Sequence, residues 1–245
     1  MKKFNLFILF LSLIPSLCFG GWYYSKVESG GGTTLSFVIA AHDDQASNNT
    51  LTVASGSLTG LQDDDIMIAL ILRHHSETTT STPTGWTSVA VHTYSSSMRA
   101  ELWYKVASSE SGSYTWDYTN NQRSSLTIAV YRGGFDTADP VDAFSNTQYI
   151  TDNTTVQAAG ITISANDSPL LVIGGQYETS ATTFTAPASP GTFAEDVDYS
   201  NITGDHHRFF YSQTANSGAT GNMDVTASLS ASVYKHAFAL SFNPD

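Results

Sequence analysis

The densest group of oxygen ligands in the sequence is a run of three aspartates, Asp63, Asp64 and Asp65. Asp43 and Asp44 come earlier in the chain. Ca²⁺ takes about six to eight oxygen ligands, and loops that lead into β-strands often supply them. These three residues are consecutive, whereas an EF-hand places its ligands at alternate positions. Two interpretations stay open: a Ca²⁺ site at this run, or a solvated turn that begins a strand.

A second group has the residue types of a carbohydrate site. Tyr114, Trp116 and Tyr118 alternate onto one face of an expected strand, and Trp103 lies among charged residues of another. A sugar ring stacks on flat aromatic rings that are flanked by charged and amide groups. The same rings also fill the interiors of β-sandwiches, because each buries a large area. The sequence therefore leaves ligand binding and core packing open for these residues.

Four of the histidines occur as two adjacent pairs, His74-His75 and His206-His207. Neighbouring residues on a strand point to opposite faces, so each pair offers one ligand to any given site. One pair ends an expected strand and the other begins one. We therefore expect histidines at strand ends rather than a transition-metal site.

No motif of a catalytic site is present. The chain contains no Gly-x-Ser-x-Gly, no His-Glu-x-x-His and no phosphate-binding glycine loop. Its single cysteine, Cys18, lies in a segment that we expect to be removed, which excludes a thiol nucleophile. We expect a protein that is not an enzyme and has no cofactor other than the Ca²⁺ considered above. Two carboxylates that meet across sheets, as in glycosidases, are the one catalytic arrangement that the sequence leaves open.

These residues lie in a chain whose pattern is β throughout. β-branched and aromatic runs alternate with Gly, Pro, Asn and Ser, without a helical period of useful length. The apolar run 65–72 has an echo in 168–175, and a similar order of strands, loops and turns follows each run. We predict one domain over 35–245: an all-β, two-sheet antiparallel β-sandwich of jelly-roll type, built from related halves of about 35–135 and 136–245.

The same pattern predicts individual strands. We expect strands at 35–40 and from 51 onward, with a polar loop at 43–50 between them, and separate strands at 114–118 and 126–131. Alternation in the strand 99–106 defines two faces. The predicted core face consists of Ala100, Leu102, Tyr104 and Val106, and the predicted polar face of Arg99, Glu101, Trp103 and Lys105.

The first residues resemble a secretory signal peptide. Lys2 and Lys3 precede the apolar run 4–14, and Pro15 interrupts it before a small-residue cleavage pattern. The run is shorter than the roughly 20 apolar residues that cross a bilayer. We expect residues 1–20 to be removed and the protein to be secreted, with an extracellular location on a cell surface or virion.

Residues 21–34 are expected to form a flexible segment, because Gly30, Gly31 and Gly32 adjoin one another. Trp22, Tyr23 and Tyr24 begin this segment and are candidate assembly residues that would dock on the domain or on a neighbouring subunit. A loose terminus is the competing interpretation.

The charge of the chain excludes two classes of partner. Its net charge is −12, from 10 basic and 22 acidic residues. Binding to nucleic acid and to anionic membranes both depend on Lys and Arg, so we expect neither. Four Asn-x-Ser/Thr triplets leave glycosylation open, because modification depends on the host. They begin at Asn48, Asn153, Asn166 and Asn201.

Five motifs follow one another in an order that resembles a little-characterised group of jelly-roll-like β-sandwich domains. They are 61–69 (LQDDDIMIA), 82–87 (TPTGWT), 102–107 (LWYKVA), 112–116 (GSYTW) and 129–133 (AVYRG). Such domains occur in phage tail, fibre and other virion proteins and in secreted bacterial surface proteins. The resemblance extends over about 35–242 and implies a structural fold without catalytic residues.

Two functions follow as expectations. The first is a secreted, non-catalytic structural or surface protein that self-assembles as a homo-oligomer or filament, or decorates a cell surface or virion. The alternative is a carbohydrate-binding module or adhesin that binds a glycan with Trp103, Tyr114, Trp116 and Tyr118, assisted by Ca²⁺.

Overall fold

The structure, a computed structural model, describes residues 34–75, 77–94, 98–151, 154–177, 182–201, 206–228 and 233–245. Within these ranges the chain forms sixteen β-strands and one short 3-10 turn, and no α-helix. The strands are β1 (Ser36–Ala54), β2 (Ile66–His74), β3 (Thr79–Ser81), β4 (Thr87–Tyr94), β5 (Met98–Val106), β6 (Ser113–Arg132), β7 (Val141–Thr151), β8 (Thr155–Ala158), β9 (Thr162–Ile163), β10 (Ser168–Tyr177), β11 (Phe184–Thr185), β12 (Ala194–Asn201), β13 (His206–Ala215), β14 (Gly218–Ala219), β15 (Met223–Ala227) and β16 (Val233–Phe242).

All strand pairs in this part of the chain are antiparallel, which confirms the prediction of an all-β antiparallel protein. No helix among the described residues is long and apolar enough to span a membrane. The expected signal peptide and the candidate assembly residues Trp22, Tyr23 and Tyr24 lie outside the described residues.

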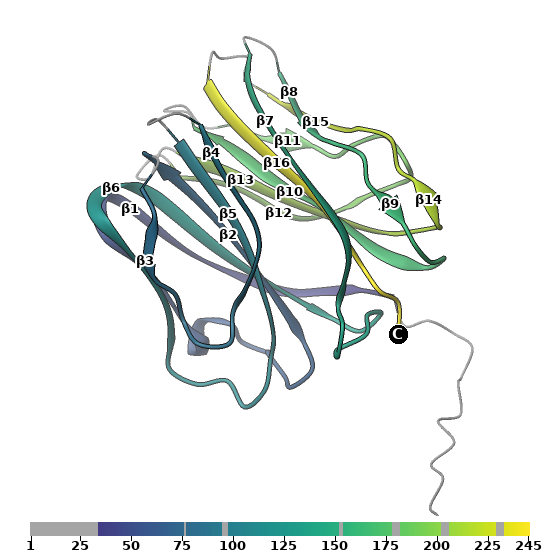
Figure 1. Ribbon diagram of the computed structural model, residues 1–245, viewed down its shortest axis with the longest axis horizontal. Helices are drawn as coiled ribbons and strands as arrows, with labels where there is room; N and C mark the ends of the chain where they lie inside the picture. The colour runs from purple at the N-terminus through teal and green to yellow at the C-terminus, as the bar shows by residue number, and fades with distance from the viewer. Residues whose placement is uncertain are drawn as a thin grey trace, which may run out of the picture. The chain divides into compact units, whose positions relative to one another are not determined.

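The strands group into four sheets rather than one clear two-sheet sandwich, and this corrects the prediction (Figure 1). The first sheet runs β1-β6-β2-β5-β4, with β3 paired to β6 beside this path. The second sheet runs β12-β13-β10-β16-β7. A three-stranded sheet, β11-β15-β8, and a two-stranded sheet, β14-β9, complete the set.

The two large sheets have matching strand orders. Followed from β7, the second sheet runs β7-β16-β10-β13-β12, so that β1, β6, β2, β5 and β4 each have a counterpart at the same place. A backbone detail repeats as well. Asp64 (φ 68°) and Asp167 (φ 59°), both in the left-handed region, stand in the turns that lead into the central strands β2 and β10.

Apolar side chains form three clusters, one between the two large sheets and one on the outer face of each. The inner core lies between the large sheets and includes Leu70 and Leu102 of the first and Phe210 and Leu240 of the second. The second outer core lies between the second sheet and the three-stranded sheet. The first outer core covers the other face of the first sheet, where Trp116 packs near Met67 and Ile128.

The first outer core is closed by the strands of the first sheet themselves. Residues 36–45 of β1 pair with 124–132 of β6 in the sheet, and residues 50–54 then pair with 113–117. The register shifts at Gln45, Asn48 and Thr50 mark the irregular region between the two stretches. The prediction of a loop at 43–50 is therefore wrong, and so is the prediction that 114–118 and 126–131 are separate strands. Cross-strand hydrogen bonds continue through stretches in which the side chains are polar.

The alternation in β5 is confirmed on one face only. Ala100 and Leu102 lie in the inner core, and Tyr104 and Val106 pack against it. The opposite face is not a solvated polar face, because Glu101 is fully buried and Arg99 is almost so. The covering layer of β3 and β6 explains the difference, since Thr79 of β3 bonds to Glu101.

Candidate functional site

Three of the predicted ligand-binding aromatics lie inside the protein. Tyr114, Trp116 and Tyr118 are buried and point into the first outer core. The ring of Trp86 stands edge-on to Trp116, with centroids 5.0 Å apart, and to Tyr114, with centroids 5.5 Å apart. In this arrangement the rings fill the core and offer no open face to a sugar.

Trp103 differs from these three because its side chain is only partly buried at the margin of the first outer core. Its indole Nε1 donates a hydrogen bond to Glu101 Oε2 at 3.0 Å, which fixes the plane of the ring. Of the predicted aromatic set, this residue alone keeps an accessible surface.

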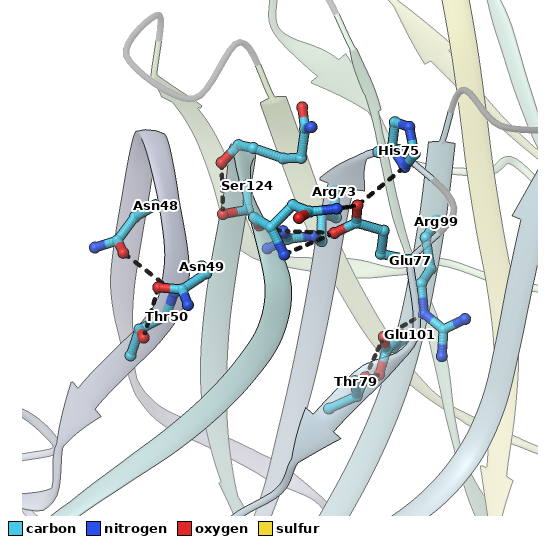
Figure 2. Close-up of polar contacts among 12 residues, drawn as sticks. Asn48, Asn49, Thr50, Arg73, His75, Glu77, Thr79, Arg99, Glu101 and Ser124 are labelled. Atoms are coloured by element: carbon cyan, nitrogen blue, oxygen red, sulfur yellow. Dashed lines mark hydrogen bonds and ion pairs between the residues drawn. The ribbon is translucent and has the colours of Figure 1, made fainter.

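Glu101 is the centre of a buried polar group (Figure 2). Besides the bond from Trp103, its carboxylate accepts a bond from Thr79 Oγ1 at 2.7 Å and one from Arg99 Nε at 2.5 Å. Three donors therefore surround a carboxylate that has no exposed surface. A carboxylate so fully bonded stabilises the junction between β3 and β5 and has no free oxygen for a reacting molecule.

Arg73 and Glu77 lie at the end of the first sheet where β2 ends (Figure 2). The Arg73 guanidinium stacks 4.0 Å above the Tyr118 ring and donates to the carbonyl of Asn120. Glu77 lies 3.6 Å from Arg73 and accepts bonds from the backbone and side chain of Asn120. These contacts join the end of β2 to the bend of β6, a structural arrangement.

The three predicted Ca²⁺ ligands have different surroundings. Asp65 is buried and forms a two-pronged ion pair with Arg132, in which both N–O distances are 2.7 Å. Asp63 accepts a bond from the backbone of Ser109, and Asp64 is exposed. The described ranges contain no cluster of three or more His, Cys, Asp or Glu side chains arranged to hold a metal ion.

The candidate glycosylation residues are placed as follows. Asn48 accepts a bond from the backbone of Thr50 near the bend of β1 (Figure 2). Asn166 is exposed and accepts a bond from Ser217. Asn153 lies outside the described residues, and Asn201 ends β12.

The two histidine pairs stand at strand ends, as expected. His74 stacks on Tyr177 of the second sheet with ring centroids 5.1 Å apart. His206 meets the edge of the same tyrosine ring, with centroids 5.6 Å apart, and His207 contacts Ser200 at 2.5 Å.

A polar interface between the two large sheets was not predicted from the sequence. Arg208 of β13 is fully buried and pairs with Asp44 of β1, with Nη2 2.8 Å from Oδ1. Beside it, the ring of His42 stacks on Tyr199 at a centroid distance of 3.9 Å. Burial, and then the charge of Arg208, lower the pKa of His42 to about 4.

A second histidine contact lies towards the opposite edges of the sheets. The rings of His92 on β4 and His236 on β16 are 5.5 Å apart. Within the described ranges neither ring nitrogen of the buried His236 has a hydrogen-bond partner. Burial, and then His92, lower the pKa of His236 to about 3, so both rings are neutral at pH 7.

A shallow surface groove of about 400 Å³ lies beside β3 and β6. Its charged lining residues are already engaged: Lys105 lies 2.8 Å from Glu110, and Tyr114 Oη donates to Glu110 at 2.9 Å. Asp117 accepts a bond from Thr50 at 3.0 Å. The groove is therefore polar, but its lining groups bond mainly to one another.

The edge strands of the two large sheets are unequal. β1 contains Asp43 and Asp44 and has irregular register, and β12 contains three acidic residues and a register shift. Charges and irregularities of this kind protect a sheet edge from pairing with another chain. β4 has a register shift but no Asp, Glu, Lys or Arg. In β7, residues 143–151 contain no charged residue and no proline, and their pairing with β16 is regular.

The exposed large apolar side chains lie on these edge strands. In the described residues they are Phe37 on β1, Val91 on β4 and Phe144 on β7, and Phe144 is the most exposed at 49%. Phe144 stands opposite Leu240 of the inner core, so its ring is on the face of the second sheet that looks towards the first. A long, uncharged, regular edge with an exposed phenylalanine is the strongest candidate for a functional site, and the sequence analysis missed it.

Comparison with known proteins adds no relative: no family model, no curated protein and no solved structure matches the chain. The resemblance to virion and surface β-sandwich domains therefore stays a prediction.

Proposed function

We propose that this protein is a secreted, non-catalytic structural or surface protein that assembles with another polypeptide chain by adding a strand to the edge of β7. The observation that carries this proposal is the unprotected edge from Ala143 to Thr151, with Phe144 exposed on it. The chain belongs on a cell surface, filament or virion.

Strand addition suits this edge for two physical reasons. Among the described strands β7 pairs with β16 alone, so an incoming strand would find backbone N–H and C=O groups along its outer side. The same strand would cover part of the Phe144 ring and remove its apolar surface from water. The backbone bonds would supply affinity, and the phenylalanine would supply a preferred position along the edge.

The placement of the carboxylates supports a role without catalysis. Asp44, Asp65 and Glu101 are each held by an arginine inside the protein. A glycosidase pair needs two carboxyl groups facing each other across a cleft, with room for the sugar between them. These carboxylates instead stabilise the junctions between strands.

The matched strand orders support the finer fold proposal as well. The chain would be one β-sandwich of jelly-roll type, made of two related halves whose large sheets enclose the inner core. On this view the resemblance to virion and surface domains describes a structural module rather than an activity.

Glycan binding is the second candidate function, and Trp103 favours it. Its ring is partly exposed and held in one plane by Glu101, with Ser88 opposite it on β4. This single-ring platform is smaller than the face predicted from the sequence, because Tyr114, Trp116 and Tyr118 are buried.

The assembly proposal is tested in cells that secrete the chain. We expect the wild-type protein to sediment with high-mass extracellular or surface material, seen by negative-stain electron microscopy. Phe144→Glu should move it to the soluble fraction, whereas Phe37→Glu on the acidic edge strand β1 should not. Equal sedimentation of wild type and Phe144→Glu would rule out docking at β7.

A further inference from the structure

The position of the unprotected edge restricts how chains can join. β4 and β7 contact each other on one side of the paired large sheets, and β1 contacts β12 on the other (Figure 1). The first side has no lysine, arginine or acidic residue on its edge strands except Asp142. The second side has five carboxylates on its edge strands, listed here as Asp43, Asp44, Glu195, Asp196 and Asp198.

Asp142 does not protect the β7 edge from pairing with another strand. Its carboxylate accepts bonds from the backbone of Ser164 at 2.9 Å and from Ser241 Oγ at 3.1 Å. Both partners belong to the same chain, so this charge is directed towards neighbouring strands of the protein. The uncharged part of the edge therefore begins at Ala143.

This difference between the two sides favours a closed dimer over an open filament. A filament needs two different complementary surfaces, one at each end of the subunit. Here the second surface would be the side with β1 and β12, where register shifts interrupt both edge strands and oppose pairing. A two-fold dimer needs only one surface, used by both copies, and the uncharged side supplies it.

We propose that the partner of β7 is β7 of a second copy, and that the two strands pair antiparallel about a two-fold axis into a closed dimer. This inference rests on the proposed function and names its partner. The closed dimer would then be the form in which the protein attaches to surface material, so that Phe144→Glu releases the protein by dissociating the dimer. The two five-stranded sheets become one sheet of ten strands, five from each copy. Symmetry favours this pairing, because a two-fold axis perpendicular to two strands makes them antiparallel, as are all other strand pairs here.

We place the two copies of β7 in the register of complete overlap. The axis then passes through the middle residue of Val141–Thr151, Asn146. Asn146 is exposed and would stand directly opposite Asn146 of the other copy. Phe144, two positions away on the same face, would be covered by the added strand.

The net charge of −12 per chain also favours a dimer formed through the uncharged sides. Two acidic molecules repel each other, and the repulsion is smallest when their uncharged sides meet and their acidic edges point away. Higher salt should therefore strengthen the dimer, because it screens the remaining repulsion.

A cysteine at the axis tests the register directly. Opposite residues of an antiparallel pair have Cα atoms about 4.5–5.5 Å apart, which suits a disulfide. In the purified full chain as processed by the cell, oxidation of Asn146→Cys should give a covalent dimer. Phe37→Cys on β1 is the matched control and should remain monomeric on a denaturing gel, as should the wild type.

Charge reversal tests the two-fold symmetry without a covalent bond. Like charges directly opposite each other destabilise a strand pair, so Asn146→Lys and Asn146→Glu should each weaken the dimer by up to about fivefold in sedimentation equilibrium. An equimolar mixture of the two variants should associate at least as tightly as wild type. No gain on mixing would overturn pairing at Asn146.

The outcomes separate this inference from the proposed function. A mass that rises beyond the dimer with concentration would overturn the closed dimer. A purified monomer that forms no Asn146→Cys cross-link would overturn the second copy as partner. If Phe144→Glu still released such a monomer from surface material, docking at β7 would stand with a different chain. If Phe144→Glu released no monomer from surface material, both proposals would be wrong.

Discussion

The guanidinium of Arg208 and the carboxylate of Asp44 form an ion pair that joins the second large sheet to the first, with Nη2 and Oδ1 2.8 Å apart. Arg208 has no exposed surface, and Nη1 also donates to the Leu126 carbonyl at 3.3 Å. The Tyr199 ring lies 4.8 Å from the guanidinium carbon. A buried cation with these partners depends on its anion, because water cannot replace the lost charge.

Removal of Asp44 should therefore be costly. We expect Asp44→Ala to lower the free energy of unfolding by about 3–5 kcal/mol, because it leaves Arg208 buried without a counter-ion. The double variant Asp44→Leu with Arg208→Met should recover most of this loss. Urea denaturation followed by tryptophan fluorescence measures both, and equal destabilisation in the single and double variants would contradict the explanation.

Acid should destabilise the protein through its buried histidines. The folded pKa values of His42 and His236, about 4 and about 3, lie below the usual 6.5. The unfolded chain therefore takes up protons first, and stability present above pH 6.5 is lost as the pH falls towards 4. Each of the two rings should contribute a loss on the order of 3 kcal/mol, since one pKa unit corresponds to about 1.4 kcal/mol.

The acid effect can be assigned to a particular ring. His236→Phe removes a buried titrating group and should flatten the decrease in melting temperature between pH 6.5 and 4, whereas His75→Ala, at a half-exposed side chain, should leave it unchanged. Asp196 and Asp198 oppose the trend in part, because burial raises the pKa of each carboxyl. A profile that is flat in the wild type would refute the histidine mechanism.

The two tryptophans on the outer face of the first sheet should respond differently to truncation. Trp116→Ala empties a buried site and should cost about 3–5 kcal/mol, whereas Trp103→Ala should cost less because its ring is only partly buried. Thermal unfolding measures both, and a glycan array with Trp103→Ala as control tests the second candidate function. Glycan binding that survives Trp103→Ala would remove this residue from consideration.

Millimolar Ca²⁺ should leave the melting temperature of the wild type unchanged. Asp65 is held by Arg132 and Asp63 accepts a bond from Ser109, and the described residues contain no group of three His, Cys, Asp or Glu side chains that could hold a metal ion. Calorimetry with Ca²⁺ and with a chelator measures this. A midpoint that rises with Ca²⁺ and falls in Asp63→Ala would restore the metal interpretation.

Local sequence patterns were sufficient to predict the fold class, because each strand shows its own pattern of apolar residues. The central strands β2 and β10 and the inner face of β5 were predictable from apolar runs and alternation alone. The extent of β1 and β6 was not, because polar residues continue a strand whenever a neighbour supplies the backbone bonds.

The candidate site could not be predicted from local sequence patterns for a similar reason. Glu101 looked solvated because its burial depends on Thr79 of a strand that covers it. The exposure of Phe144 depends on strand order, which places β7 at an edge. Its sequence signal is the absence of charged residues over 143–151, which does not by itself place a strand at the edge of a sheet.

The continuity of β1 and β6 also affects how the protein opens. In the first half, both strands extend from the large sheet into the outer layer, so amides on either side of the bend should exchange with solvent as one cooperative unit. In the second half the corresponding layer is made of separate strands, β8, β11 and β15. Because these strands pair with one another and meet the second sheet only through side chains, we expect their amides to exchange with solvent separately from those of that sheet.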